Sequence, residues 1–295
     1  MDGELVDPQL AVANRAIVGE GSLWDVQKKV LYWVDIIGHA VYIYDPKTKQ
    51  NRTIQTCQSV GTVVPRAKGG LAVALHNGFA TIDMETEKIT PIADPERDIP
   101  GNRFNEGKCD PAGRFWAGTM DYFCNPGKGT LYCLDTDESV TKKISPVTVS
   151  NGITWSLDHK TMYFIDTGLD NVRAYDYDID TGQISNERVV IKHDSDVGHF
   201  DGMSIDEEGM LWIAIWEGWG VKRYDPNTGK LLRYLRLPVQ KTTSCAFGGE
   251  KMDELYVTSA TFELDEKQLE DQPLAGSLIK VDPDVRGVPG HAYGG

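Results

Sequence analysis

One β-strand unit recurs six times along the chain, and this repeat constrains the fold more than any other feature. Each copy contains a turn rich in Asp, Gly or Lys, a strand of aromatic and β-branched residues, a loop, a second strand and an acidic turn. The aromatic strands begin at residues 31, 71, 115, 162, 211 and 255, so successive copies start 40 to 49 residues apart. Repeats of this period are typical of propellers and solenoids. A β-sandwich would not explain them.

The sequence shows no sustained helical periodicity. The best candidate, Phe262 to Gln272, is a polar insertion in the sixth unit, and we interpret it as a loop with about one helical turn. Six β units without helices to cover a parallel sheet predict an all-β, six-bladed β-propeller with four-stranded antiparallel blades. We expect a single domain, 1–295, whose blades span roughly residues 14–60, 61–100, 101–148, 149–198, 199–240 and 241–290.

Composition excludes several classes of partner. The net charge is −14 and the pI is near 4.9, whereas a protein that binds nucleic acid needs a basic surface. No stretch approaches the roughly eighteen apolar residues of a membrane span, and no signal peptide is visible. The five cysteines are scattered without a Cys-x-x-Cys pair, so we expect free thiols rather than a disulfide or zinc site. These features predict a cytoplasmic protein, a monomer or weak homo-oligomer, with no nucleic-acid or membrane partner.

A fixed spacing places oxygen-bearing side chains at equivalent points of the units. Counting back five residues from the turn before each aromatic strand gives six register positions: Glu20, Gly61, Asn105, Asn151, Asp201 and Ser244. The innermost strand of each propeller blade lines the central channel, and equivalent positions on these strands point to the same axial height. The carboxylates of Glu20 and Asp201 and the carboxamides of Asn105 and Asn151 should therefore meet at one end of the channel.

An all-oxygen set of this kind suits a hard divalent cation such as calcium, magnesium or manganese. Buried carboxylates without a partner are costly, which favours a shared metal site over four independent accidents. Other interpretations exist for the single residues. Asn151-Gly152 is by itself a strong type I′ turn signal, and Glu20 and Asp201, each beside a glycine, could be solvated loop acids.

The same positions carry a resemblance to a known family. From about Val18 to Val281 the chain resembles the gluconolactonase, regucalcin (senescence marker protein) and luciferin-regenerating enzyme family. The segments that carry the resemblance are Gly19-Glu20-Gly21-Ser22-Leu23-Trp24, Arg103-Phe104-Asn105-Glu106-Gly107-Lys108, Ser150-Asn151-Gly152-Ile153-Thr154-Trp155-Ser156 and Phe200-Asp201-Gly202.

The resemblance implies a six-bladed propeller with one divalent metal ion held by Glu20, Asn151 and Asp201. Calcium is the first candidate, and magnesium, manganese, zinc and iron are the others. Asp201 matches the acid assigned as general base, and Arg103 and Asn105 match residues that contact the sugar. One departure is visible: relatives of regucalcin have a substrate-contacting Glu where this chain has Phe123. Asp121 or Tyr122 is the expected replacement.

We therefore expect a metal-dependent hydrolase that opens sugar lactones such as gluconolactone or xylonolactone. A divalent cation polarises the carbonyl and activates water, and Asp201 would take the proton. Two alternatives share the metal site. One is a non-catalytic calcium-binding or regulatory propeller, and the other is a phosphotriesterase-type ester hydrolase.

Three further expectations concern the surroundings of Asp201 and the pocket. The Gly- and Pro-containing loop from Asp121 to Gly129 is either a flap over the pocket or an ordinary hairpin loop. His199 shares the face of Asp201 by alternation and is a candidate for the pocket. Met203 and Ile205 also share that face, which predicts an apolar channel below the metal.

Overall fold

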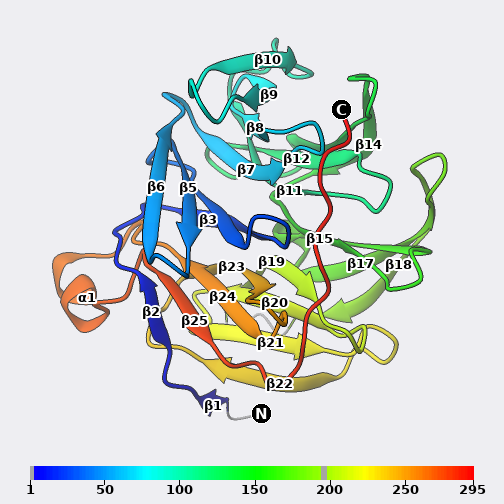
Figure 1. Cartoon of the computed structure of the whole chain (residues 1–295). Helices are drawn as coiled ribbons and strands as arrows, with labels where there is room; N and C mark the ends of the chain where they lie inside the picture. Colours follow the sequence, from blue (N-terminus) through cyan, green and yellow to red (C-terminus); the bar gives the residue numbers. More distant parts are fainter. Residues whose placement is uncertain (1–2, 194–197) are drawn as a thin grey trace.

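Six sheets surround a central axis in the computed structural model, which describes residues 3–193 and 198–295 (Figure 1). Four of them consist of four consecutive antiparallel strands each. These are β3 (Gly19–Asp25), β4 (Val30–Asp35), β5 (Ala40–Asp45) and β6 (Gln50–Gln55); β7 (Val60–Pro65), β8 (Leu71–Leu75), β9 (Gly78–Ile82) and β10 (Ile89–Ala93); β11 (Asn102–Cys109), β12 (Phe115–Asp121), β13 (Gly129–Leu134) and β14 (Val140–Val147); and β15 (Ser150–Trp155), β16 (Thr161–Asp166), β17 (Asn171–Asp178) and β18 (Gln183–Lys192). The predicted six-bladed β-propeller with four-stranded antiparallel blades is confirmed.

The N-terminal residues complete the last two sheets. The fifth sheet contains β19 (His199–Ile205), β20 (Leu211–Trp216), β21 (Gly220–Tyr224) and β22 (Leu231–Arg236), and β1 (Glu4–Leu5) pairs with β22 in parallel. The sixth contains β23 (Thr242–Gly248), β24 (Glu254–Ser259) and β25 (Leu278–Val281), and its outer strand is β2 (Gln9–Val12). Because β2 pairs with β25, the two ends of the chain meet in one sheet and close the ring. The first blade was expected to begin at residue 14, after β2.

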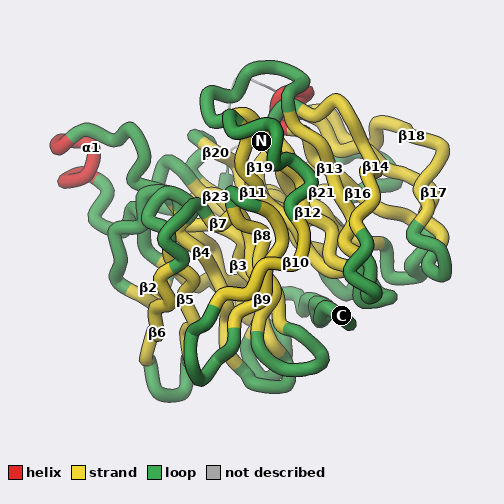
Figure 2. The backbone as a smooth tube through the Cα atoms, turned by 90° about the horizontal axis from the view of Figure 1, so that it is seen from above, coloured by secondary structure: helices red, strands yellow, loops and turns green. Residues whose placement is uncertain are grey.

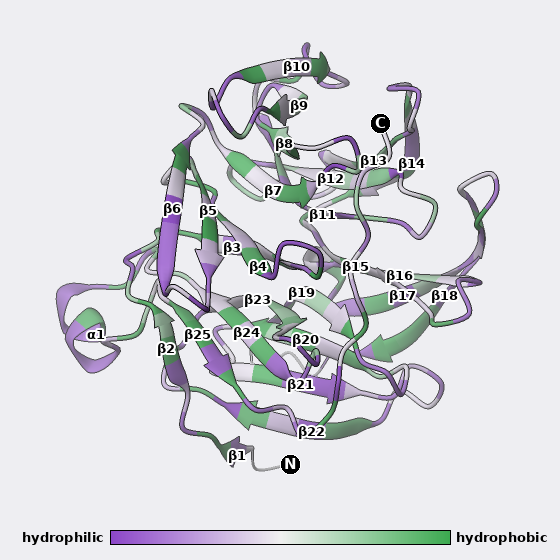
Figure 3. Cartoon of the chain, in the orientation of Figure 1, coloured by the Kyte–Doolittle hydropathy of each residue, from purple (hydrophilic) through white to green (hydrophobic). Residues whose placement is uncertain are grey.

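Burial falls from the axis to the rim of each blade. The inner strands β3, β15 and β23 are buried along their whole length. The outer strand β6, with the sequence Gln-Asn-Arg-Thr-Ile-Gln, buries only Ile54 and is coloured as hydrophilic in Figure 3. Each inner strand contacts the inner strand of the next blade, and β23 contacts β3. The core is therefore a closed ring of inner strands with apolar clusters between neighbouring sheets.

Helical structure is confined to short segments. The insertion of the sixth blade contains α1 (Glu266–Asp271), whose N-cap Asp265 forms a capping box with Gln268, and this confirms the expected single turn. Figure 2 shows α1 at the edge of the molecule, away from the axis. The only other helical segment in the described ranges is the 3₁₀ helix η1 (Thr167–Leu169). The part of the chain that the structure describes contains no helix with the length and apolar character of a membrane span. The five cysteines are free thiols, as expected.

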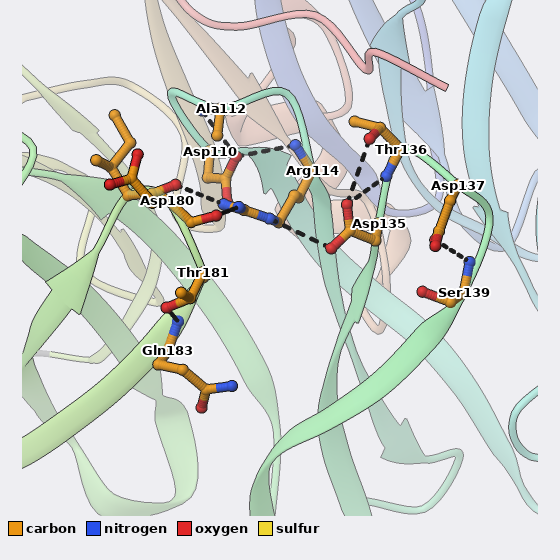
Figure 4. A network of polar contacts seen from close by, with 12 residues as sticks. Asp110, Ala112, Arg114, Asp135, Thr136, Asp137, Ser139, Asp180, Thr181 and Gln183 are labelled. Atoms are coloured by element: carbon orange, nitrogen blue, oxygen red, sulfur yellow. Dashed lines mark hydrogen bonds and ion pairs between the residues drawn. The ribbon is translucent and has the colours of Figure 1, made fainter.

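A buried aspartate links the third and fourth blades at the end of the channel where the inner strands finish. Asp110 Oδ2 accepts hydrogen bonds from Trp116 Nε1 at 2.9 Å and from the Tyr177 hydroxyl, in the next blade, at 2.7 Å. The Arg114 guanidinium lies 3.2 Å from the same oxygen and also donates to the backbone carbonyl of Asp180 at 2.5 Å (Figure 4). Each polar atom of the Asp110 carboxylate is thus used inside the fold.

We expect Asp110→Ala to lower the free energy of unfolding by about 3–5 kcal/mol, because it leaves buried donors of Trp116 and Tyr177 without their acceptor. Urea unfolding followed by tryptophan fluorescence measures the change. Asp137→Ala, in the exposed turn also drawn in Figure 4, is the control and should change stability by no more than about 0.5 kcal/mol. Equal stability of the two variants would contradict the structural role of Asp110.

Candidate functional site

The six register positions lie near the beginning of the inner strands, at one end of the channel. Each inner strand has a break in its pairing with the second strand of its blade at this point. The residues that fall in these breaks are Gly61, Asn105, Asn151, Asp201 and Ser244, and Glu20 directly precedes the break in β3. A β-bulge bends the strand and re-aims the side chain. The Asn151-Gly152 pair lies within β15, so its interpretation as a hairpin turn is wrong.

Glycines beside the bulges allow the inner strands to approach one another closely. A Cβ on Gly152 would lie 2.5 Å from the Cβ of Met203 in the neighbouring blade. One on Gly202 would lie 2.7 Å from Ser244 Oγ. Larger residues would push the blades apart, so these glycines help to bring Asn151 and Asp201 toward the axis.

A chain of hydrogen bonds fixes the two carboxamides. Arg103 Nη1 donates to Asn105 Oδ1 at 2.6 Å, and Asn105 Nδ2 donates to Asn151 Oδ1 at 3.3 Å and to the Ser150 carbonyl at 2.9 Å. Asn151 Nδ2 then donates to Thr167 Oγ1 at 2.8 Å. This order of donors orients Asn151 Oδ1 as an acceptor, which is the atom that a carboxamide offers to a cation.

The two carboxyl groups of the register interact in a buried environment. Glu20 is 2% exposed and Asp201 is 6% exposed. Burial, with the nearby Glu106 carboxyl, raises the pKa of Glu20 to about 8, although the Gly21 backbone N–H donates to it. Burial and the charges of Glu20 and Glu106 raise the pKa of Asp201 well above its ordinary value. The pair carries an electrostatic conflict that a positive charge between the groups would relieve.

Glu106 is a further acidic group here that the register did not identify. Both of its carboxyl oxygens are buried without a hydrogen-bond partner in the described residues, and burial raises its pKa to about 7. Simple alternation places Glu106 on the face opposite to Asn105. The bulge between Phe104 and Glu106 interrupts that alternation, and the sequence contains no signal for it.

The donors fit a hard divalent cation. Glu20, Asp201 and Asn151 offer carboxyl and carboxamide oxygens. When ionised, the buried acidic groups carry negative charge that such an ion would neutralise. In residues 3–193 and 198–295 there is no cluster of three or more His, Cys, Asp or Glu side chains suited to a metal. A cation would thus rely on two carboxylates completed by neutral amide oxygens.

The residues expected to contact substrate differ in their surroundings. Arg103 is 9% exposed, and its guanidinium lies 5.8 Å from the centre of the Tyr122 ring. The Tyr122 hydroxyl is 2.9 Å from Ser59 Oγ. Asp121 Oδ1 accepts hydrogen bonds from Phe123 N at 2.8 Å and Asn125 Nδ2 at 2.9 Å. Phe123 itself is 87% exposed.

His199 lies at the beginning of β19 and contacts an aspartate. His199 Nδ1 lies 2.6 Å from Asp170 Oδ2, so its ring is held at the β16–β17 connection rather than by the carboxyl pair. The prediction that Met203 and Ile205 make the channel below Asp201 apolar holds for Ile205, which lines a mainly apolar part of the channel, but not for Met203. Met203 packs in the cluster between the fourth and fifth sheets, because the bulge between Phe200 and Met203 changes the alternation. The inner strands present polar contacts there, including Ser22 Oγ to Ser244 Oγ at 3.3 Å.

Comparison with known proteins identifies the family of the chain. The model of the SMP-30/Gluconolactonase/LRE-like region matches residues 18–261. Regucalcin of Danio rerio is 44% identical over 290 residues, with 97% of this chain and 98% of the relative covered. Regucalcin of Xenopus laevis is 42% identical over 293 residues, with 97% and 98% covered. A solved regucalcin from Agrobacterium tumefaciens, described as a calcium-binding protein, has a TM-score of 0.93 at 27% identity and covers 98% of both chains.

The raised pKa of Glu20 predicts how the stability of the metal-free protein depends on pH. The folded protein retains this proton up to about pH 8, whereas the unfolded chain releases it near the ordinary value of 4.5. Because the folded state binds more protons in this window, the free energy of unfolding should fall as the pH rises through it. We expect Glu20→Gln to reduce that fall, measured by urea unfolding of chelator-treated protein at several pH values. Glu85→Gln, at an exposed turn, is the control. A pH dependence identical in wild type and Glu20→Gln would contradict the electrostatic conflict.

Proposed function

The chain belongs to the SMP-30/gluconolactonase/LRE-like family, and from that premise we propose that it is a divalent-metal-dependent hydrolase of sugar lactones. Gluconolactone and xylonolactone are the candidate substrates. The observation that carries the proposal is the meeting of Glu20 and Asp201, both buried, with the oriented carboxamides of Asn105 and Asn151 at one end of the channel. The fold alone would not support a reaction class, because propellers host many functions.

We propose that Glu20, Asn151 and Asp201 hold one divalent ion, with calcium as the first candidate. The calcium-binding description of the Agrobacterium regucalcin supports this choice of ion. When bound, such an ion supplies Lewis-acid polarisation of the lactone carbonyl and a more acidic water. Magnesium, manganese, zinc and iron are the other ions to test.

Asp201 is the proposed general base. In the metal-loaded protein its carboxylate should be ionised and able to accept a proton from the attacking water. The hydrogen-bonded contact with Asn151 and the backbone of β19 limit where this carboxylate can point. The water adds to the carbonyl carbon, the ring C–O bond then breaks, and the proton passes to the departing alkoxide to give the open hydroxy acid.

Arg103, Asn105 and Asp121 are the proposed contacts for the sugar hydroxyls. Arg103 offers a planar set of donors, and its contacts with Asn105 and Tyr122 fix the direction of its side chain. Asp121 can accept through its carboxyl group. Tyr122 comes from the same loop and lies against Arg103, so it takes part in shaping the pocket where relatives of regucalcin have the Glu that Phe123 replaces.

The test is hydrolysis of a lactone panel by metal-stripped protein with each divalent ion added back. We expect turnover that a chelator abolishes, and we expect Asp201→Asn to lower kcat by about 10²–10⁴-fold. Asp137→Asn, in an exposed turn, is the control and should leave kcat unchanged. Calorimetric titration of the same ions into Asp201→Asn separates loss of the base from loss of metal.

Each other outcome has a defined meaning. Metal binding without turnover on any lactone would favour a calcium-binding regulatory propeller. Faster turnover of an organophosphate than of any lactone would favour a phosphotriesterase. Lactone hydrolysis that is indifferent to chelation would exclude the metal-dependent mechanism.

A further inference from the structure

A second cavity lies at the other end of the channel, where the inner strands finish. Its volume is about 320 Å³, within the range of small-molecule sites. Its lining includes Ser204 and Ile205 of β19 and Ser22 of β3, whereas Asp201 and Glu20 lie nearer the first end of the same strands. At the nearest point, Ser22 is two residues from Glu20, which corresponds to about 7 Å of strand. The cavity is thus separate from the carboxyl pair.

The C-terminal segment covers this cavity as a strap, which we define as residues 287–295. Figure 1 shows the strap crossing the ring of blades beside β15. One end is fixed by Gly287 N, which donates to the Met252 carbonyl at 2.8 Å. The other is fixed by Tyr293, which is fully buried, and by Gly294 N, which donates to the Gly113 carbonyl at 2.9 Å.

The span between these anchors is held more loosely. Residues 288–292 form no backbone hydrogen bond with any part of the described chain. Four of them, Val288, Pro289, Gly290 and His291, line the cavity directly. A small ligand could therefore enter by displacement of this span while both anchors stay in place.

The lining combines aromatic surface with one fixed charge. Trp24, Trp155 and Phe247 line the cavity, together with aliphatic residues such as Leu23 and Ile205. Lys108 is the one permanently charged side chain among the lining residues. Serine, threonine and histidine side chains complete the lining, and a mainly apolar wall with a set of polar groups is typical of sites that bind small organic molecules.

Lys108 has donors to spare. Its ammonium group donates to the Met203 carbonyl, which uses one of three N–H groups. It also interacts electrostatically with Glu106, two residues earlier, but no carboxylate of the described residues forms a salt bridge with it. A cation inside a mostly apolar cavity is best completed by a ligand anion.

We propose that this strapped cavity is a binding site for a small aromatic carboxylate, whose ring packs against the aromatic lining and whose carboxylate pairs with Lys108. The site is independent of lactone hydrolysis, since none of its lining residues belongs to the carboxyl pair or to the carboxamide chain.

Benzoate is the probe, and its binding to the full-length protein is measured by ligand-observed NMR and by quenching of tryptophan fluorescence. Saturable binding in the millimolar range or tighter is expected for a ligand of this size. Lys108→Met, which keeps the apolar stem, should weaken benzoate binding by about tenfold or more. Lys28→Met, at an exposed turn of the same end of the propeller, should leave it unchanged.

A filling variant tests the location independently of charge. A Cβ on Gly290 would lie 3.3 Å from Leu23 Cδ1, so Gly290→Leu directs its side chain into the cavity and should also abolish benzoate binding. Asp201→Asn should retain it, which distinguishes this site from the proposed catalytic end. Absence of saturable binding, equal affinity for benzoate and benzamide, or binding that survives both Lys108→Met and Gly290→Leu would overturn the proposal.

Discussion

The close approach of six inner strands around one axis is the constraint on which the rest of the molecule depends. Each inner strand contacts the next, and β23 contacts β3, so the inner strands form one closed ring. Glycines such as Gly152 and Gly202 allow the approach, because a Cβ at either position would meet the neighbouring blade. The outer strand β2 then closes the ring with residues from the other end of the chain. Because the ring is closed, the blades cannot spread to relieve local crowding at the axis.

That crowding explains the chemistry of the candidate site. Asn105, Asn151 and Asp201 lie in bulges of their inner strands, and Glu20 directly precedes the bulge of β3. Their side chains come together at one end of the channel. On an open surface, solvent would screen these acidic groups from one another. In this fold the groups are buried side by side. Their raised pKa values record the resulting free-energy cost. This electrostatic conflict, which the folding of the ring creates, is the basis on which we propose a cation at this end of the channel.

Features that recur in all six blades were predictable from the sequence. Features found in a single blade or strand were not. The common period and the turn spacing placed Glu20 and Asp201 on inner strands, because both signals repeat in all six units. Strand β2 carries no copy of the repeat, so its role in the sixth sheet was invisible. The count of five residues did not identify Glu106, and alternation assigned Met203 to the wrong face, because alternation holds only in strands without a bulge. A bulge depends on the neighbouring blade, and single-strand patterns contain no information about it.

The two ends of the channel differ because the inner strands supply different groups to each. At the first end the inner strands present carboxyl and carboxamide groups, which is the chemistry of the proposed cation site. At the second end the strands finish in residues such as Trp24, Trp155 and Ile205, and Lys108 supplies the single fixed charge, so the site suits an anion with an aromatic body. Glu106 lies between Asn105 and Lys108 on β11 and interacts with the charged groups of both ends. The two ends therefore share Glu106 as an electrostatic neighbour, although no lining residue belongs to both.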